Sequence, residues 1–387
     1  MSRFVSGNRI TLLRTGTEYF PALEAACDAA AHEIYLEAYI FEDDRTGRRI
    51  AQALLRAARR GVTIHVLIDG FGSKDISDAL LQEMQDGGVR VLKYRPDISP
   101  WTLRRERLRR MHRKTVVIDA RIAFVGGINI IDDMHTPRQK PPRFDYAVRI
   151  EGPLLADIYP VVTRLWTLVM WTQLHQRWHS PATSIYAKRC GKQRAAFVVR
   201  DNLRNRRDIE NAYLDAIAHA KSEIIIASAY FFPGRSFRRA LVDAAGRGVR
   251  VMLLLQGRVE YLLLHYAARA LYGAFLAAGI EIHEYRRSFM HAKVAVIDNR
   301  WSTVGSSNID PMSLLLAREA NIVIDDAGFA HELRQSLTNA MTDGAQQVHR
   351  AGWKKQPLRV RMMSWICYQL VRFLTGWSSY GREREFR

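Results

Sequence analysis

Two histidines in this chain each begin the same sequence motif, a phrase of polar and small residues that occurs twice with identical spacing. In each phrase a lysine follows the histidine after one residue, an aspartate follows five positions later, and an asparagine follows ten positions after that. The matching positions are His112, Lys114, Asp119 and Asn129 in the first phrase, and His291, Lys293, Asp298 and Asn308 in the second. Paired imidazoles suit phosphodiester chemistry, because one can attack phosphorus while the other protonates the leaving group.

The lysines and asparagines supply the other groups that such a site needs. A histidine and a lysine two positions apart in a strand point to the same face, so each phrase would present both together. The lysines would offset the charge that builds on phosphorus in the transition state. Asn129 and Asn308 follow small residues and would donate hydrogen bonds to phosphate oxygens. The sequence offers no carboxylate-rich cluster for Mg²⁺ or Ca²⁺, so we expect neither a metal nor another cofactor.

The phrase HxKx4D, followed by small residues and asparagine, resembles the signature of the phospholipase D superfamily, and both copies are intact. The resemblance implies a two-step reaction through a phosphohistidine. By analogy with the family, His112 would be the nucleophile and His291 the acid/base, although the near-symmetry of the phrases leaves the reverse open. Family members also place an acidic residue downstream of the motif to orient the histidine. Asp145 and Glu319 are the candidates.

The two motif aspartates are the least certain members of the set. Asp119 and Asp298 belong to the signature and are counted among the catalytic candidates. They fall at the far ends of their expected strands, however, where they could hold loops or lysines rather than touch substrate. The sequence leaves both roles open.

The duplication extends to the elements that must position these residues. Residues 33–70 and 223–257 each contain an apolar run, a turn, an amphipathic segment, an Arg-Gly-Val junction and a second apolar run. Preceding helices are expected at 20–32 and 208–220, and another helix precedes each His-x-Lys strand. This β-α-β-α-β order predicts a duplicated α/β fold, in which each half is a mostly parallel sheet flanked by helices. The resemblance implies that the halves pack around one pseudo-twofold active site.

The expected division of the chain follows from these patterns. The first phospholipase D-like half is predicted at 1–185, the second at 196–345, and a separate basic, Trp-rich segment at 350–387. The stretch 180–196 is polar, basic and rich in structure-breaking residues, as a linker should be.

Composition limits the partners and the location. The net charge of +19 and the pI near 10.1 favour anionic partners, and both acidic phospholipid and nucleic acid satisfy that. Three scattered cysteines suggest neither a zinc site nor a disulfide framework. The N-terminal residues lack an apolar signal-peptide core, and no uncharged apolar run reaches the roughly 18 residues of a spanning helix. A lipid substrate would therefore be met at the membrane surface.

Three segments are candidates for that surface contact. Residues 350–387 carry nine Lys or Arg and two acids, interleaved with Trp and aliphatic residues. This composition predicts an interfacial helix, and the alternative is a helix packed on the core of the protein. The basic run 104–114 leads into the first motif and is expected at the mouth of the site. The Trp-rich stretch 166–178 is a further candidate.

Sequence segments near the two motifs narrow the resemblance to one group within the superfamily. Gly-Ser-Ser-Asn-Ile-Asp-Pro at 305–311, Arg-Ile-Glu-Gly-Pro at 149–153 and Ala-Tyr-Phe-Phe-Pro-Gly at 229–234 are similar to bacterial cardiolipin synthases, in the short form without two N-terminal spanning helices. The resemblance implies phosphatidyl transfer from one phosphatidylglycerol, or another phospholipid, to a second phosphatidylglycerol, with release of glycerol. It also implies a peripheral protein at the cytoplasmic face of the bacterial inner membrane, with phosphatidylglycerol and cardiolipin as its partners.

Other functions remain open at this point. A phospholipase D or a phosphatidylserine synthase would use the same phosphatidyl-enzyme with water or serine as the acceptor. A nuclease or other phosphodiesterase is permitted by the charge, but the apolar, Trp-rich tail argues against nucleic acid. A non-enzymatic membrane-binding protein conflicts with two intact motifs.

Overall fold

The computed structural model describes residues 3–96, 109–136, 140–174, 185–201, 205–258, 262–310, 317–354 and 356–380. The described strands of the first half are β1 (Val5–Arg14), β2 (Glu33–Ala38), β3 (Thr63–Asp69), β4 (Val89–Tyr94), β5 (Thr115–Ile118), β6 (Ile122–Gly126) and β7 (Tyr146–Glu151). Its helices are α1 (Thr15–Asp28), α2 (Arg45–Arg59), α3 (Asp78–Asp86) and α4 (Leu155–Leu174).

The second half repeats this plan and extends it. Its strands are β8 (Gln193–Arg200), β9 (Glu223–Ser228), β10 (Arg250–Gln256), β11 (Glu281–Tyr285), β12 (Lys293–Ile297), β13 (Trp301–Gly305), β14 (Glu319–Asp325) and β15 (Ala345–Gln347). Its helices are α5 (Asp208–His219), α6 (Arg235–Gly246), α7 (Leu262–Arg269), α8 (Tyr272–Ala277), α10 (Ala327–Gly344), α11 (Arg350–Lys354) and α12 (Leu358–Tyr380). The half begins at Gln193, slightly before the predicted boundary at 196, because β8 pairs with both β1 and β14.

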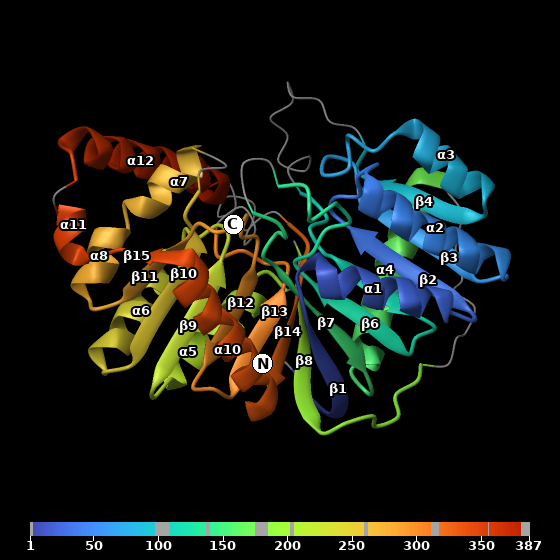
Figure 1. Cartoon of the computed structure of the whole chain (residues 1–387), viewed down its shortest axis with the longest axis horizontal. Helices are drawn as coiled ribbons and strands as arrows, with labels where there is room; N and C mark the ends of the chain where they lie inside the picture. Colours follow the sequence, from blue (N-terminus) through green and yellow to red (C-terminus); the bar gives the residue numbers. More distant parts are fainter. Residues whose placement is uncertain are drawn as a thin grey trace.

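One 15-stranded sheet runs through both halves (Figure 1). Its order is β15-β11-β10-β9-β12-β13-β14-β8-β1-β7-β6-β5-β2-β3-β4, so the halves are arranged symmetrically about the antiparallel β1–β8 pair. The duplicated α/β fold predicted from the sequence is confirmed. The prediction of a mostly parallel sheet holds only for β2-β3-β4 and β9-β10-β11, which are joined through helices.

The other strand pairs are antiparallel, and in two of them the reason is local. The connections β5–β6 and β12–β13 are tight turns, and a turn of that length can join only antiparallel strands. Asp119 and Ala120 have φ values of +51° and +48°, and Asp298 and Asn299 have +51° and +49°. Positive φ at both central residues is the mark of a type I′ hairpin turn. The sequence pattern revealed the apolar runs but not these turns.

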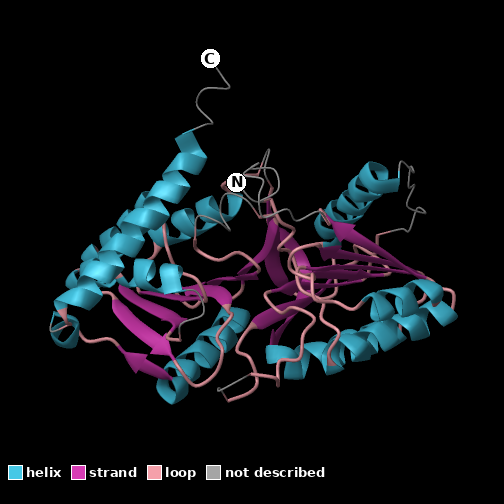
Figure 2. Ribbon diagram, turned by 90° about the horizontal axis from the view of Figure 1, so that it is seen from above, coloured by secondary structure: helices cyan, strands magenta, loops and turns pink. Residues whose placement is uncertain are grey.

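Helices cover both faces of the sheet (Figure 2). Helices α1, α2 and α3 cover the outer face of the first half, and α5, α6, α7, α8 and α12 cover that of the second. A third core lies between the halves and combines residues of both, including Val117 and Val148 from the first and Val294 and Ile322 from the second. Strands β6 and β7 face β13 and β14 there. This shared core fixes one motif relative to the other.

Candidate active site

Each motif histidine is bonded to a carboxylate from the other half of the chain. His112 Nδ1 lies 3.0 Å and 3.1 Å from the two carboxylate oxygens of Glu319. His291 Nδ1 lies 2.7 Å from Asp145 Oδ2. The sequence identified both carboxylates, but each lies against the histidine of the other half rather than against the one upstream of it in its own half. The two motifs therefore form a single site.

Backbone bonds between the halves produce this crossing. The His112 amide donates to the Arg318 carbonyl at 3.0 Å, next to Glu319. The His291 amide donates to the Phe144 carbonyl at 2.8 Å, next to Asp145. Each histidine is thereby placed beside the strand start that carries its carboxylate.

Low solvent exposure and nearby lysine charge favour the neutral form of both histidine rings. Burial is the main cause that lowers the pKa of His112, with Lys114 adding to the effect and Glu319 opposing it. Burial and Lys293 lower the pKa of His291 to about 3. A neutral imidazole whose Nδ1 proton is held by a carboxylate has Nε2 unprotonated, which is the form that can attack phosphorus.

One contact at His291 competes with this assignment. Lys293 Nζ also lies 2.7 Å from His291 Nδ1. A ring nitrogen that donates to Asp145 cannot accept from an ammonium group at the same time. The matching bond between His112 and Glu319 favours the carboxylate, and Lys293 can donate instead to the His291 carbonyl.

The two lysines bring positive charge to the same place. Lys114 and Lys293 are 4% and 1% exposed. Lys114 donates to the His112 carbonyl at 2.8 Å, and its ammonium group lies 5.0 Å from the centre of the Tyr39 ring. Burial is the main cause that lowers the pKa of Lys114 to about 7, and the charge of Lys293 adds to it. An anionic phosphate between the lysines would relieve both effects.

The predicted asparagines border the same space. Asn129 lines a cavity of about 500 Å³ together with Asp145 and His291. Its side-chain oxygen accepts from the Ile40 amide at 3.2 Å, which leaves the amide nitrogen as the group that can donate. Asn308 is buried in the second half, and its Oδ1 has no hydrogen-bond partner among the described residues. The placement leaves the Asn129 amide nitrogen able to donate to a phosphate, and for both residues that role stays a prediction.

The motif aspartates lie at the opposite ends of their strands and do not join the histidines. Asp119 accepts from the amides of Ala31, His32 and Glu33 at 2.8–2.9 Å. Asp298 accepts in the same way from the backbone amides of residues 221–223. Neither aspartate contacts a motif histidine, so the geometry does not support a direct catalytic role. They tie the turn after each motif strand to the start of the neighbouring strand, which is the loop-holding alternative.

Two small residues that the sequence did not single out position the carboxylates. A Cβ at Gly127 would lie 2.3 Å from Asp145 Oδ1, so a side chain there would displace that carboxylate. Ser306 occupies the matching place in the second half, and its hydroxyl donates to Glu319. The small residues before each asparagine were visible in the sequence. They were interpreted as allowing the backbone to approach the phosphate closely, and not as contacts of a carboxylate.

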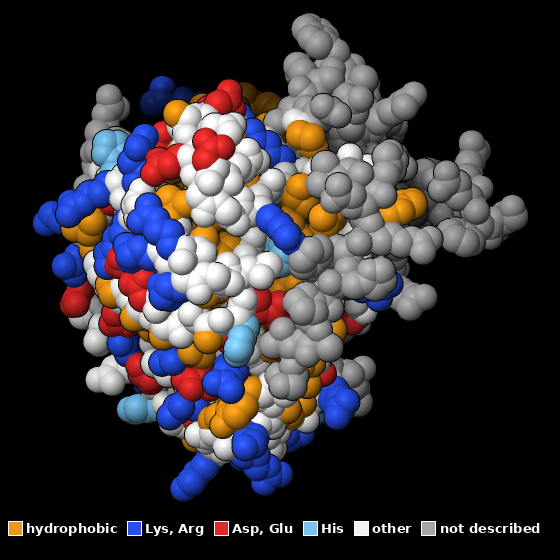
Figure 3. Space-filling model, turned by 90° about the vertical axis from the view of Figure 1, so that its right-hand side faces the viewer, with side chains coloured by type: hydrophobic (Ala, Val, Ile, Leu, Met, Phe, Trp, Pro, Cys, Tyr) orange, Lys and Arg blue, Asp and Glu red, His pale blue; other side chains and the backbone are white. Residues whose placement is uncertain are grey.

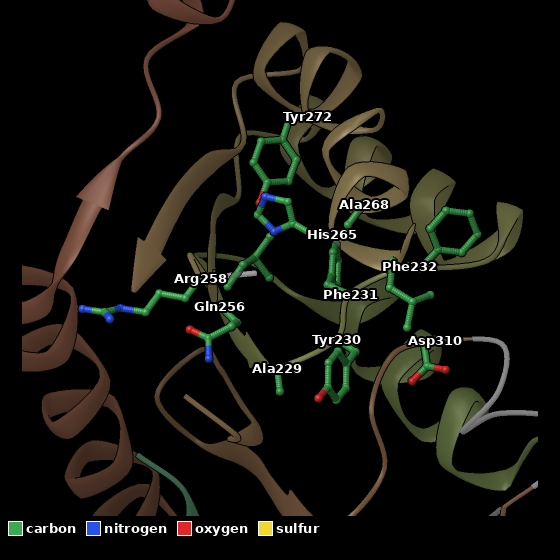
Figure 4. A pocket seen from close by; sticks show the side chains of 12 residues that line it. Ala229, Tyr230, Phe231, Phe232, Gln256, Arg258, His265, Ala268, Tyr272 and Asp310 are labelled. Atoms are coloured by element: carbon green, nitrogen blue, oxygen red, sulfur yellow. The ribbon is translucent and has the colours of Figure 1, made fainter. Parts of the chain in front are cut away.

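The pseudo-twofold symmetry is broken beside the second motif (Figure 4). Gln256 at the end of β10 donates to the Met290 carbonyl at 3.3 Å and borders a pocket beneath α7, into which the ring of His265 projects. At the matching place in the first half, Asp69 accepts from the Met111 amide and from the amides of a tight turn. The end of β3 thus holds a tight turn, whereas the matching end of β10 borders a pocket.

One face of the C-terminal segment packs on the core, and contact of its other face with a membrane stays a prediction. Cys367 and Val371 of α12 are buried in the core of the second half. The opposite face of the helix exposes large apolar side chains, namely Leu358, Met362, Met363, Trp365, Ile366, Leu370 and Phe373. Across the described residues, every helix is either too short or too polar to traverse a lipid bilayer.

The other candidate surfaces are only partly described. Of the basic run 104–114, residues 104–108 lie outside the described residues. In the stretch 166–178, Trp166 is buried and Trp171 is 54% exposed, while Trp178 lies outside the described part. On the outer face of the first half, basic and acidic side chains are interspersed (Figure 3), as in the pair of Arg56 with Asp28 at 2.9 Å. The part of that face that the structure describes presents no continuous basic stripe.

Comparison with known proteins agrees with the fold and the site. The family model described as "Cardiolipin synthase, PLD-like domain" matches residues 23–140 and 213–341. The chain is 40% identical to cardiolipin synthase B of Shigella flexneri over 374 residues, which are 96% of this chain and 90% of the relative. The same values hold for cardiolipin synthase B of Escherichia coli strain K12. The crystal structure of phosphatidylserine synthase from Haemophilus influenzae Rd KW20 superposes with a TM-score of 0.70 at 14% identity, covering 97% of both chains.

The family match over both halves and the 40% identity to cardiolipin synthase B, together with the two carboxylate-bound histidines, make the chain a phospholipid-modifying transferase of the phospholipase D type. Within that class, the chain belongs to the family of cardiolipin synthases with a PLD-like domain.

Proposed function

We propose that this protein is a cardiolipin synthase, which transfers a phosphatidyl group to the glycerol hydroxyl of phosphatidylglycerol and releases an alcohol. The observation that carries the proposal is the pair of neutral, partly exposed histidines, each held by a carboxylate and accompanied by a buried lysine. The similarity to cardiolipin synthase B over nearly the whole chain supports this substrate class.

The proposed reaction has two displacements at phosphorus. In the first, the negative charge of the bound phosphodiester favours protonation of His291 Nε2, which burial and Lys293 oppose in the empty site. His112 Nε2 then forms a bond to phosphorus while the bond from phosphorus to the headgroup oxygen breaks, and His291 Nε2 gives that oxygen its proton. In the second, His291 takes the proton of the acceptor hydroxyl, whose oxygen binds phosphorus as the P–N bond breaks. Glu319 stabilises the positive charge on His112 while it carries phosphorus. Lys114 and Lys293 offset the charge on the phosphoryl oxygens.

The assignment of the nucleophile has its own test. In a His291→Ala variant the acid/base is missing, so the phosphatidyl group should accumulate on His112 when the donor has a good leaving group. Mass spectrometry of peptides from the quenched reaction should find the adduct on the peptide that contains residue 112. An adduct on His291 in the His112→Ala variant would reverse the assignment.

The proposed location is the cytoplasmic face of the inner membrane, reached from the surface. Helix α12 supports this, since it is anchored by Cys367 and Val371 and exposes an apolar face flanked by basic residues. Basic residues near an anionic leaflet each contribute about 1 kcal/mol. Burying Trp365 and Phe373 in the lipid interface would add roughly 2 kcal/mol together.

A double variant tests this membrane contact. Trp365→Ser with Phe373→Ser should weaken binding to phosphatidylglycerol vesicles about 30-fold, by conversion of that free energy. Val242→Ser is the matched control, because Val242 is an exposed apolar residue on α6. Unchanged sedimentation of the double variant with vesicles would leave α12 as a helix of the core only.

Product analysis tests the reaction itself. Purified protein is incubated with phosphatidylglycerol vesicles in EDTA, and the lipids and free glycerol are measured. Cardiolipin and glycerol in equal amounts are expected. Phosphatidic acid alone would indicate a phospholipase D, and product only after addition of serine to a phospholipid donor would indicate a phosphatidylserine synthase. If phosphatidylglycerol alone gives no product, phosphatidylethanolamine is added as the donor.

A further inference from the structure

A basic groove flanks the first motif on the side of α4. It encloses about 1210 Å³ of space open to solvent. Four of its lining residues are arginines, namely Arg113, Arg164, Arg200 and Arg318, and one is an acid, Asp201. The carboxylate of Asp201 is already bonded to Asn205, through the backbone amide at 3.1 Å and the side-chain amide at 3.2 Å. With four arginines against the carboxylates of Asp201 and of Glu37, which pairs with Arg113, the groove keeps excess positive charge.

The arginines are held in place by the fold. Arg113 is 3% exposed and pairs with Glu37 at 2.6 Å, while its Nε is buried without a hydrogen-bond partner among the described residues. Arg200 is 2% exposed and donates to the Ala317 carbonyl. Arg318 Nε donates to the Tyr94 hydroxyl at 3.3 Å. Fixed guanidinium groups of this kind suit a phosphate, which they can contact through several N–H groups at once.

The pseudo-twofold partner of this groove lacks its charge. Ala292 replaces Arg113 in the second motif, and Phe144 occupies the position that matches Arg318. The pocket beside Phe144 is lined by one basic residue, Arg287, and one acid, Asp343. The duplicated motifs are thus nearly identical, whereas the surfaces that flank them differ in charge. Such a difference in charge can separate the place of the acceptor from that of the donor, even when both are phosphatidylglycerol.

The groove also has an apolar wall. Val161, Leu165 and Leu168 of α4 line it, and Leu168 is 46% exposed. Helix α4 lies behind the sheet of the first half in the view of Figure 1. Phosphate-binding arginines beside an apolar wall match an anionic phospholipid better than a free phosphate ion or a nucleic acid, since neither of the latter would use the wall.

We propose that this groove binds the acceptor lipid of the transfer reaction, with its phosphodiester on the arginines and part of an acyl chain along α4. Arg113 and Arg318 adjoin His112 and Glu319 in the chain but, by alternation, direct their side chains to the other face. Arg200 pairs with Glu319 in the register of β8 and β14, so the groove opens at the edge of the sheet that carries the histidines. The inference rests on the proposed synthase function and assigns its second substrate a place.

The test compares two acceptors for the same phosphatidyl-enzyme. The full-length protein is given phosphatidylglycerol vesicles in buffer that contains ethanol, and cardiolipin and phosphatidylethanol are measured together. Arg164→Glu should lower the ratio of cardiolipin to phosphatidylethanol about tenfold, because ethanol does not need the groove. Leu168→Asp should lower the ratio in the same direction. Both side chains are exposed, which limits the risk of misfolding.

Arg59→Glu is the control, since Arg59 is an exposed residue at the end of α2 on the outer face of the first half. It makes the same charge change and should leave the ratio unaltered. If Arg164→Glu leaves the ratio unaltered, or lowers both products equally, the groove does not bind the acceptor. If the wild-type protein forms phosphatidylethanol but no cardiolipin, the synthase function itself is refuted.

Discussion

Replacing Glu319 with glutamine keeps the shape of the side chain and removes its charge. The Glu319 side chain is fully buried and its carboxylate lies 3.0 Å from His112 Nδ1. When His112 attacks phosphorus the ring becomes positively charged, so the carboxylate interacts more strongly with the transition state than with the resting enzyme. Removing one partner of a buried ion pair costs roughly 3 kcal/mol. We therefore expect kcat to fall about 150-fold, at ten-fold for each 1.36 kcal/mol.

The pH profile gives this prediction a second, independent readout. Glu319 raises the pKa of His112 and so opposes the effect of burial. Without that charge the pKa of His112 falls further, and the neutral, nucleophilic ring persists to lower pH. The acid limb of kcat/KM for cardiolipin formation should therefore move to lower pH in Glu319→Gln, even though the rate is lower.

A carboxylate on the same strand supplies the control. Asp325 ends β14 and pairs with Arg194 and Arg300 near the surface. Asp325→Asn should leave both kcat and the acid limb unchanged. The orienting role of Glu319 is refuted if Glu319→Gln retains full kcat, or if its acid limb moves to higher pH.

Other expected outcomes test the remaining groups. His112→Ala and His291→Ala should each abolish turnover while vesicle sedimentation persists, and substantial transfer by either variant contradicts the two-histidine mechanism. Asp119→Asn should lower the free energy of unfolding in urea by roughly 3 kcal/mol, because three amides lose a charged acceptor, and a folded variant with no kcat would argue for a chemical role instead. Vanadate binding at pH 8 should take up about 0.9 proton, since Lys114 with a pKa of about 7 is then mostly neutral. Calorimetry in buffers of different ionisation enthalpy measures this uptake, and Lys114→Arg should remove it.

The parts of this protein that depend on local spacing follow from the sequence. A histidine and a lysine two positions apart share a strand face whatever surrounds them, so the catalytic phrase is visible in the chain. The apolar runs and amphipathic segments likewise predict the α/β halves, and the glycines after α2 and α6 adopt φ values of +89° and +86°. These features are set within a few residues of one another, where the covalent chain limits the choices.

The tertiary structure decided which groups meet across the halves. The family resemblance indicated Asp145 and Glu319 as partners for the histidines, but only the backbone bonds between the halves decide that each serves the motif of the other half. The same holds for the motif aspartates, whose amide partners lie more than 70 residues away in the chain. The basic groove is a third case, because its arginines come from three separated segments and from α4. Contacts between distant segments depend on how sheets and helices pack, and that packing leaves no periodic pattern in the sequence.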